Sequence, residues 1–123
     1  MKKIQKSGED YLETIYLLSL ANINVRSVDV ANSLGVTKPS VAKALKILEE
    51  QEYIKKGKYA KIALTEKGKL LAELIQKKHK AIRMLLIEIL KVSPEKAEID
   101  ACRIEHCLSE ETTEKLFDFL NIK

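Results

Sequence analysis

Three features of the 123-residue sequence predict a mainly α-helical fold with one small β-hairpin. Apolar residues recur at helical spacing over most of the chain, which indicates amphipathic helices. Between residues 53 and 64 the pattern changes to alternation, with Gly57 at a turn, as expected for two short antiparallel strands. A helical pattern of roughly 25 residues then continues to about Leu90, long enough to leave one folded body and reach a second.

Composition limits the class of protein. A hydrophobic content of 46% in 123 residues suffices for one domain or for two small ones. No apolar run approaches the length of a transmembrane helix, so we expect a cytoplasmic protein with no membrane partner. Cys102 and Cys107 would lie on different faces of one helix, which argues against a disulfide between them and agrees with a reducing compartment.

Charge is distributed unevenly along the chain. Residues 1–80 contain 16 Lys and Arg against 9 Asp and Glu, whereas residues 81–123 contain 6 against 9. The basic part is a candidate nucleic-acid surface, and the acidic part suits cations. Ordinary solvated helix faces would give the same counts, so charge alone leaves both interpretations open.

The sequence after the first helix has the pattern of two helices joined by a short turn. Ser27 is the expected N-cap of a short helix that stops at Gly35, because glycine accepts a positive φ. Thr37 is the expected cap of the next helix, which has Pro39 in its first turn and runs to about Glu52. Such a pair is a helix-turn-helix pattern, typical of DNA-binding proteins.

The predicted hairpin follows this pair directly and is rich in lysine, as expected for a wing. Lysines on the wing and small or basic residues on the first turns of the second helix are suited to phosphates and base edges. Solvation would explain any single lysine equally well. The candidate DNA-binding residues are Arg26, Thr37, Lys38, Pro39, Ser40, Lys43, Lys55, Lys56, Lys58 and Lys61.

A later helix, opened by Ser93-Pro94, concentrates metal-ligand types on one face. Cys102, Glu105 and His106 are spaced i, i+3 and i+4, so their side chains point the same way, and Glu98 extends that face by one turn. A divalent first-row cation takes four to six donors, so one helical turn cannot close a coordination sphere alone.

Further donors are available elsewhere in the chain. A first helix, expected from about Ser7 to Ala21, carries Asp10 and Glu13 at i, i+3 spacing, and His79 lies on the long helix. A metal that used Asp10 together with the later cluster would tie the N-terminal segment to the C-terminal third. Such a tie is one way for a ligand to set geometry across a molecule.

Several segments match a known family in order and spacing over nearly the whole chain. They are residues 7–16, 25–31, 39–41, 64–68, His79 and residues 100–109. In these segments the sequence resembles the diphtheria-toxin-repressor and manganese-transport-regulator family. The resemblance implies a winged-helix DNA-binding domain, residues 1–70, followed by a helical metal-binding and dimerisation domain, residues 71–123. It also implies a homodimer on a double-stranded DNA operator, with divalent metal activating DNA binding.

The resemblance implies a ligand set as well. Asp10, Cys102, Glu105 and His106 would form the central site, with Glu13 and His79 available for a neighbouring metal. The Asp10–Glu13 pair is similar to the manganese-sensing branch, whereas Cys102 is similar to the iron-sensing branch. The expected cofactor is therefore Mn(II) or Fe(II), and Zn(II), Co(II) or Ni(II) is expected to bind in vitro.

The sequence departs from the iron-sensing branch at two places. Those members pair the histidine at position 79 with a carboxylate four residues on, where this chain has Arg83, although Glu98 could partner His79 instead. They also tend to carry a C-terminal SH3-like domain, and with the chain ending at Lys123 we expect none.

Three other functions are compatible with parts of the pattern. A metal-independent winged-helix repressor would leave Cys102, Glu105 and His106 as an ordinary polar helix face. A thiol enzyme using Cys102 and His106 lacks an orienting third group and a glycine-built oxyanion site, so we expect no enzyme and no small organic substrate. A metal-storage protein would leave the basic helix and hairpin unexplained. We therefore expect a metal-dependent regulator that represses genes for Mn(II) or Fe(II) uptake.

Overall fold

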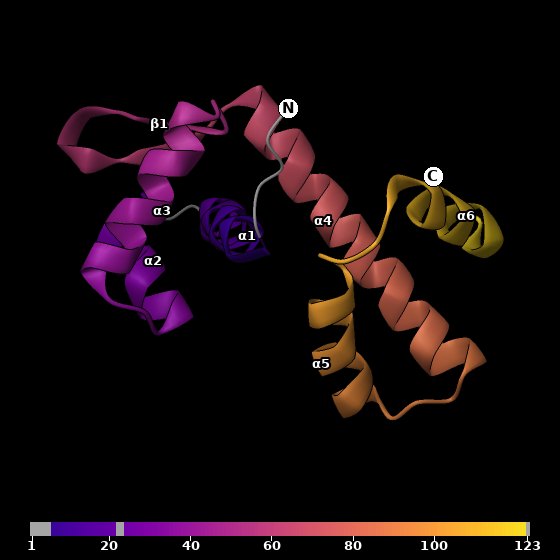
Figure 1. Ribbon diagram of the computed structural model, residues 1–123. Helices are drawn as coiled ribbons and strands as arrows, with labels where there is room; N and C mark the ends of the chain where they lie inside the picture. The colour runs from indigo at the N-terminus through magenta and orange to yellow at the C-terminus, as the bar shows by residue number, and fades with distance from the viewer. Residues whose placement is uncertain (1–5, 22–23, 123) are drawn as a thin grey trace. The chain divides into compact units, whose positions relative to one another are not determined.

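The computed structural model describes residues 6–21 and 24–122, and the chain divides into two compact units, residues 1–73 and residues 74–123 (Figure 1). The described residues form six α-helices and one two-stranded antiparallel hairpin. The predicted mainly α-helical fold class with a small hairpin is thus confirmed. None of the described helices is both long and apolar enough to cross a membrane.

The first unit consists of three helices, the hairpin and the first part of a long helix. In chain order they are α1 (Lys6–Leu20), α2 (Ser27–Leu34), α3 (Lys38–Glu50), β1 (Ile54–Lys56), a short 3-10 turn η1 (Lys58–Ala60), β2 (Ile62–Leu64) and α4 (Glu66–Met84).

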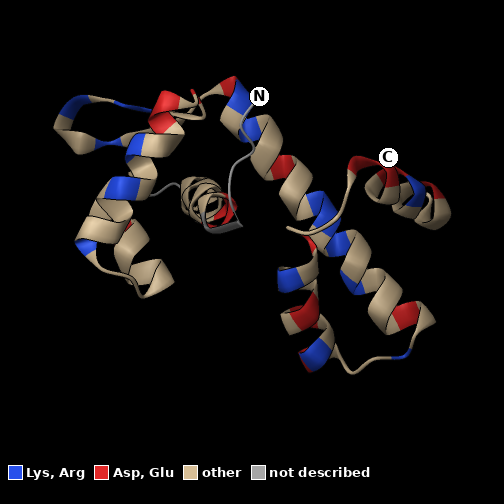
Figure 2. Ribbon diagram, viewed as in Figure 1, with Lys and Arg blue, Asp and Glu red and all other residues tan. Residues whose placement is uncertain are grey.

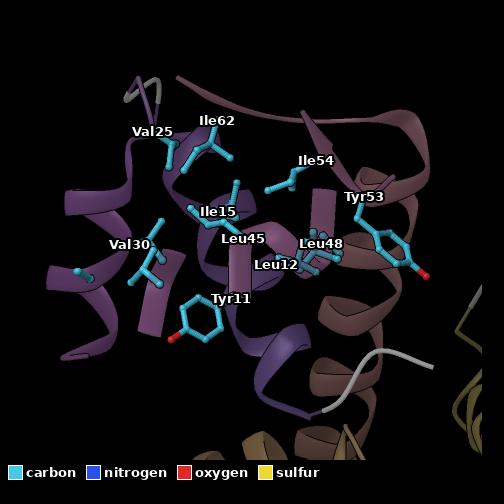
Figure 3. Close-up of a cluster of buried hydrophobic side chains, with 13 residues drawn as sticks. Tyr11, Leu12, Ile15, Val25, Val30, Leu45, Leu48, Tyr53, Ile54 and Ile62 are labelled. Carbon is cyan, nitrogen blue, oxygen red and sulfur yellow. The ribbon is translucent and has the colours of Figure 1, made fainter. Parts of the chain in front are cut away.

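Large aliphatic side chains from α1 and α3 meet in the core of this unit (Figure 3). Leu12 and Ile15 of α1 and Leu45 and Leu48 of α3 are fully buried. Val41 completes the buried stripe of α3. Because this stripe turns one face of α3 into the core, the opposite face of the helix is exposed to solvent.

The helix-turn-helix has the predicted turn but not the predicted first cap. Gly35 ends α2 with φ of 67°, and the hydroxyl of Thr37 accepts a hydrogen bond from the Ser40 N–H at 3.3 Å, as expected for the cap of α3. The prediction of Ser27 as N-cap is wrong, because Ser27 is already helical. Arg26 is the N-cap, and its N–H donates to the carboxylate of Asp29 at 2.9 Å.

The hairpin is shorter than the alternating pattern predicts. Its register pairs Ile54 with Leu64 and Lys56 with Ile62, and the expected alternation from Tyr59 onward is wrong before Ile62. Tyr59 has φ of 60° and so turns the backbone out of the strand conformation. Gly57 lies at the start of the loop with an ordinary negative φ, and its N–H donates to the Lys61 carbonyl at 2.8 Å.

Thr65 begins α4 as predicted and also fastens the end of the hairpin. Its hydroxyl accepts from the Gly68 N–H at 3.1 Å and donates to the Glu52 carbonyl at 2.6 Å. At Gly68 the helix passes so close to the hairpin that an added Cβ would lie 2.0 Å from the Tyr53 carbonyl oxygen. Glycine is therefore required here by close approach rather than by backbone conformation.

The second unit contains the remainder of α4, a π-helical turn η2 (Leu85–Ile89), α5 (Pro94–Ile104) and α6 (Glu110–Leu120). Its core combines small and large side chains, since Ala97 and Ala101 of α5 are fully buried in a cluster with Ile82 and Leu86. The predicted starts at Ser93-Pro94 and Ser109 are confirmed, and the Ser109 hydroxyl accepts from the Thr112 N–H at 3.1 Å.

Candidate nucleic-acid interface and metal centre

The exposed face of α3 carries the predicted basic residues of the helix-turn-helix. Lys38 and Lys43 are exposed, while the buried stripe of the same helix holds it against the core. Lys and Arg residues recur along α3 and the hairpin in the first unit (Figure 2). This face can therefore meet a polyanion without disturbing the packing that positions it.

Two of the predicted DNA-binding residues have a structural role at the start of α3. Thr37 caps the helix, and its hydroxyl donates to the Ser40 hydroxyl at 2.9 Å. Pro39 falls in the first turn, where its missing N–H costs no intrahelical hydrogen bond. Thr37, Pro39 and Ser40 are all exposed, so this first turn is also accessible to a ligand.

Four predicted lysines project from the hairpin and its loop. Lys55, Lys56, Lys58 and Lys61 are exposed, whereas Ile54 and Ile62 turn toward the core. The Ile62 N–H donates to the Val25 carbonyl at 2.8 Å, which fixes the segment before α2 to the hairpin. The exposed Arg26 therefore follows a residue that is hydrogen-bonded to the wing.

Sequence reasoning missed Lys46. It is exposed on α3 and lies three residues after Lys43, so the two side chains share one helix face. The signal was available, because i, i+3 spacing from a chosen residue predicts a neighbour on the same face. Lys46 extends the basic surface of α3 by one turn.

In the second unit, His79, Glu98 and Cys102 form a cluster of metal-ligand types. One donor atom from each lies within 4.8 Å of the other two, although the three residues come from two helices. Glu98 and Cys102 are exposed and His79 is half-buried. The cluster is therefore open to solvent on the side of α5.

The imidazole of His79 lies between two carboxylates. Its Nε2 is 3.0 Å from Oε1 of Glu98, the partner that the sequence suggested, and its Nδ1 is 2.8 Å from Oε2 of Glu105. The Cys102 Sγ is 3.9 Å from the same Nδ1. A neutral imidazole carries one N–H and can donate it to only one of these carboxylates, so the other ring nitrogen is the one that could bind a metal. A carboxylate that accepts the remaining N–H is a common way to orient a metal-binding histidine.

Glu105 is the buried centre of this network, with 1% of the residue exposed. It follows directly after α5, and its Oε1 lies 3.4 Å from Nε2 of His106, whose side chain is also 1% exposed. One carboxylate thus reaches both histidines of the chain. A buried carboxylate is costly unless it is compensated by donors or by a cation, so this position is suited to a positive charge.

Asp10 and Glu13 belong to the first unit, where both lie half-buried on α1. They share one face of that helix by their i, i+3 spacing. Their part in a metal site stays a prediction.

The donors present in the second unit fit a divalent transition metal. Imidazole nitrogen, carboxylate oxygen and thiolate sulfur suit Fe(II), Zn(II) and Co(II), and the carboxylates also suit Mn(II). Metal–donor bonds of about 2.0–2.3 Å place two donors of one ion within roughly 4.6 Å of each other. The donor atoms of His79, Glu98 and Cys102 lie within 4.8 Å of one another, close to that limit.

Comparison with known proteins gives the same two-part organisation. A profile of the iron dependent repressor N-terminal DNA binding domain matches residues 3–62. A profile of the iron dependent repressor metal binding and dimerisation domain matches residues 65–122.

Similar proteins and structures agree with these profiles. A helix-turn-helix-type transcriptional regulator of Methanocaldococcus jannaschii, itself uncharacterized, is 36% identical over 118 residues, which are 95% of this chain and 94% of that protein. The transcriptional regulator MntR of Salmonella typhimurium is 37% identical over 111 residues, covering 90% of this chain and 70% of MntR. The structure of the manganese regulator SloR has a TM-score of 0.82 and 31% identity, covering 99% of this chain and 56% of that chain.

Fold and site together define a winged-helix DNA-binding protein with a second, helical unit that carries metal-ligand residues. The chain belongs to the iron-dependent repressor family of metal-dependent transcriptional regulators. It spans 53% of the iron-dependent repressor IdeR of Mycobacterium tuberculosis, to which it is 29% identical, and so about half the length of that relative.

Proposed function

We propose that this protein is a homodimeric repressor whose binding to operator DNA is activated by Mn(II) or Fe(II). The observation that supports it best is the division of labour between the units. A basic helix and wing lie in one unit, and a His79–Glu98–Cys102 cluster around a buried Glu105 lies in the other. A cytoplasmic location and the repression of metal-uptake genes belong to the same proposal.

The proposed DNA contacts are divided between positioning and base recognition. Lys43 and Lys46 on α3, with the lysines of the wing, would neutralise phosphates, whereas the first turn from Lys38 to Ser40 would meet base edges. Two such helices in a homodimer would enter successive major grooves about 34 Å apart. Affinity for DNA should therefore fall steeply as salt concentration rises.

The proposed metal donors are His79, Glu98, Cys102, Glu105 and His106, joined by Asp10 and Glu13 from the first unit. Bound metal would add positive charge among these carboxylates. Without metal, the negative charges of Asp10, Glu13 and Glu105 would repel one another if these side chains came close together. Metal and DNA would then strengthen each other's binding reciprocally, by about 1–3 kcal/mol.

The test is anaerobic binding of the reduced protein to promoter DNA from its own genomic neighbourhood, titrated separately with Mn(II), Fe(II), Zn(II) and a chelator. We expect binding that requires metal and is abolished by the chelator. Glu105→Ala and His106→Ala should each remove the metal response. Tight DNA binding that ignores the chelator would favour a metal-independent winged-helix repressor instead.

A matched pair of variants separates the two units in that experiment. Replacing Lys38 and Lys43 together by alanine should abolish DNA binding and leave metal affinity nearly unchanged, because both lysines belong to the first unit and α3. DNA binding that survived this change would show that the surface of α3 is not the recognition surface.

A further inference from the structure

Arg83 is a charged residue beside the metal cluster to which the proposed function assigns no role. It lies on α4, one turn after His79, and its Nε is 3.1 Å from Oε2 of Glu98. The other oxygen of Glu98, Oε1, is 3.0 Å from Nε2 of His79. Glu98 is therefore shared between a permanent cation and a histidine of the cluster.

This pairing limits what Glu98 can offer to a metal. A carboxylate has two oxygens, and the charged hydrogen bond with Arg83 restrains Oε2 and draws on its charge, so Oε1, on the side of His79, is the oxygen better placed to bind a metal. Arg83 also keeps its charge at any physiological pH. A divalent cation bound at His79, Glu98 and Cys102 would thus meet both a reduced number of oxygen donors and a neighbouring positive charge.

The consequence differs between metals. Mn(II) prefers oxygen donors and higher coordination numbers, so it loses most when one carboxylate oxygen is withheld. Zn(II) needs only four donors and binds well to thiolate and imidazole, which Cys102 and His79 supply. It therefore does not need the second carboxylate oxygen of Glu98. An arginine at this position therefore weakens the site for hard cations more than for thiophilic ones.

We propose that Arg83 is a selectivity-determining residue, which holds Glu98 to one donor oxygen and lowers the affinity of the His79–Glu98–Cys102 cluster for Mn(II) relative to Zn(II). The proposal rests on the proposed function, in that it takes this cluster to be a metal site. Arg83 and Glu98 have side chains that are 48% and 53% exposed, so their ion pair contributes little to folding and can be removed without unfolding the unit.

The test compares the metal affinities of the wild-type protein, Arg83→Gln and Lys80→Gln. Lys80 is a matched control, because it is exposed on the same helix and its replacement removes the same charge. Affinities for Mn(II) and for Zn(II) are measured on the reduced full chain by competition with a fluorescent chelator, without DNA. Far-UV circular dichroism verifies that each variant is folded.

We expect Arg83→Gln to bind Mn(II) about 10-fold more tightly and Zn(II) at most about 3-fold more tightly, with Lys80→Gln close to the wild type. In a Glu98→Gln background the effect of Arg83→Gln on Mn(II) should become much smaller, because the part that acts through that carboxylate is lost and only the direct repulsion between the arginine and the metal remains. Equal affinities in Arg83→Gln and the wild type, or weaker binding of both metals, would overturn the role of Arg83 while leaving the metal site standing. Failure of the wild type itself to bind either metal would overturn the proposed function and this inference together.

Discussion

The two units of this protein are held together in different ways. In the first, the core is built from large aliphatic side chains such as Leu12, Leu45 and Leu48, all fully buried. In the second, α5 contributes the small residues Ala97 and Ala101, and the fully buried side chains include the carboxylate of Glu105 as well as the aliphatic Ile75. The first unit is therefore stable through apolar burial, whereas the second places a costly charge where a cation can compensate it.

This difference matches the division of function. A recognition helix must stay folded whether or not DNA is present. Burial of apolar surface stabilises it by about 25 cal/mol per Å², and this stabilisation does not depend on DNA. A sensor must change its stability when its ligand binds, and a network of carboxylates and histidines that a bound cation can stabilise further has that property. The comparison leads to four predictions, ordered from the largest expected effect to the smallest.

The largest effect is expected from removing a core side chain of the first unit. Leu45→Ala should lower the free energy of unfolding by about 2–5 kcal/mol, because Leu45 is fully buried and its truncation leaves a cavity. Chemical denaturation with and without Mn(II) measures this loss. Ile47→Ala on the same helix, 45% exposed, is the control and should cost much less. Similar losses in the two variants would contradict the assignment of the α3 stripe to the core.

The start and end signals of this unit were readable from the sequence because they are local. Thr37 and Thr65 cap their helices through residues three positions away, and Gly35 ends α2 through its own φ. The cap of α2 was misplaced by one residue, since Ser27 is a common capping type but Asp29 bonds the N–H of Arg26. Local chemistry thus predicts reliably that a helix starts in a given segment, but predicts less reliably the exact residue at which it starts.

The wing and the His79–Glu98–Cys102 cluster were harder to predict, because their geometry depends on residues that are distant in the sequence. Tyr59 adopts a positive φ in a loop whose closure is set by the strand pairing on either side, and its side chain gives no signal for it. The cluster's residue types were visible in the sequence, but the pairing of Glu98 with Arg83 depends on how α4 and α5 pack. Spacing along one helix identifies candidate metal donors. Only the packing between helices shows which other charged side chains, such as Arg83, pair with those donors.

An intermediate effect is expected from metal on the second unit. At a free Mn(II) concentration of 100 times Kd, bound metal should stabilise the unit by about 2.7 kcal/mol, which corresponds to roughly 100-fold slower exchange of amides that open with it. Hydrogen exchange at Ala97 and Ala101 in α5 measures this change. Unchanged exchange at saturating metal would contradict the view that the buried Glu105 is compensated by a cation.

The same experiment tests the donors expected from the first unit. If Asp10 takes part in the metal site, Asp10→Ala should reduce the protection of α5 by metal, since the Kd rises when a donor is lost. Glu9→Ala is a neighbouring control that removes a carboxylate outside the proposed donor set. Equal protection in the Asp10 variant and the wild type would restrict the metal site to the second unit.

The smallest effect is expected at the exposed face of α3. Lys46→Ala should leave the free energy of unfolding nearly unchanged, because the side chain is exposed, but should remove one phosphate contact from the complex with DNA. The slope of log affinity against log salt should then fall by about 0.9 for each protomer that loses the contact. Binding isotherms at several salt concentrations measure the slope, with Lys69→Ala on α4 as an exposed control. A slope equal in both variants would show that α3 meets DNA only through its first turns.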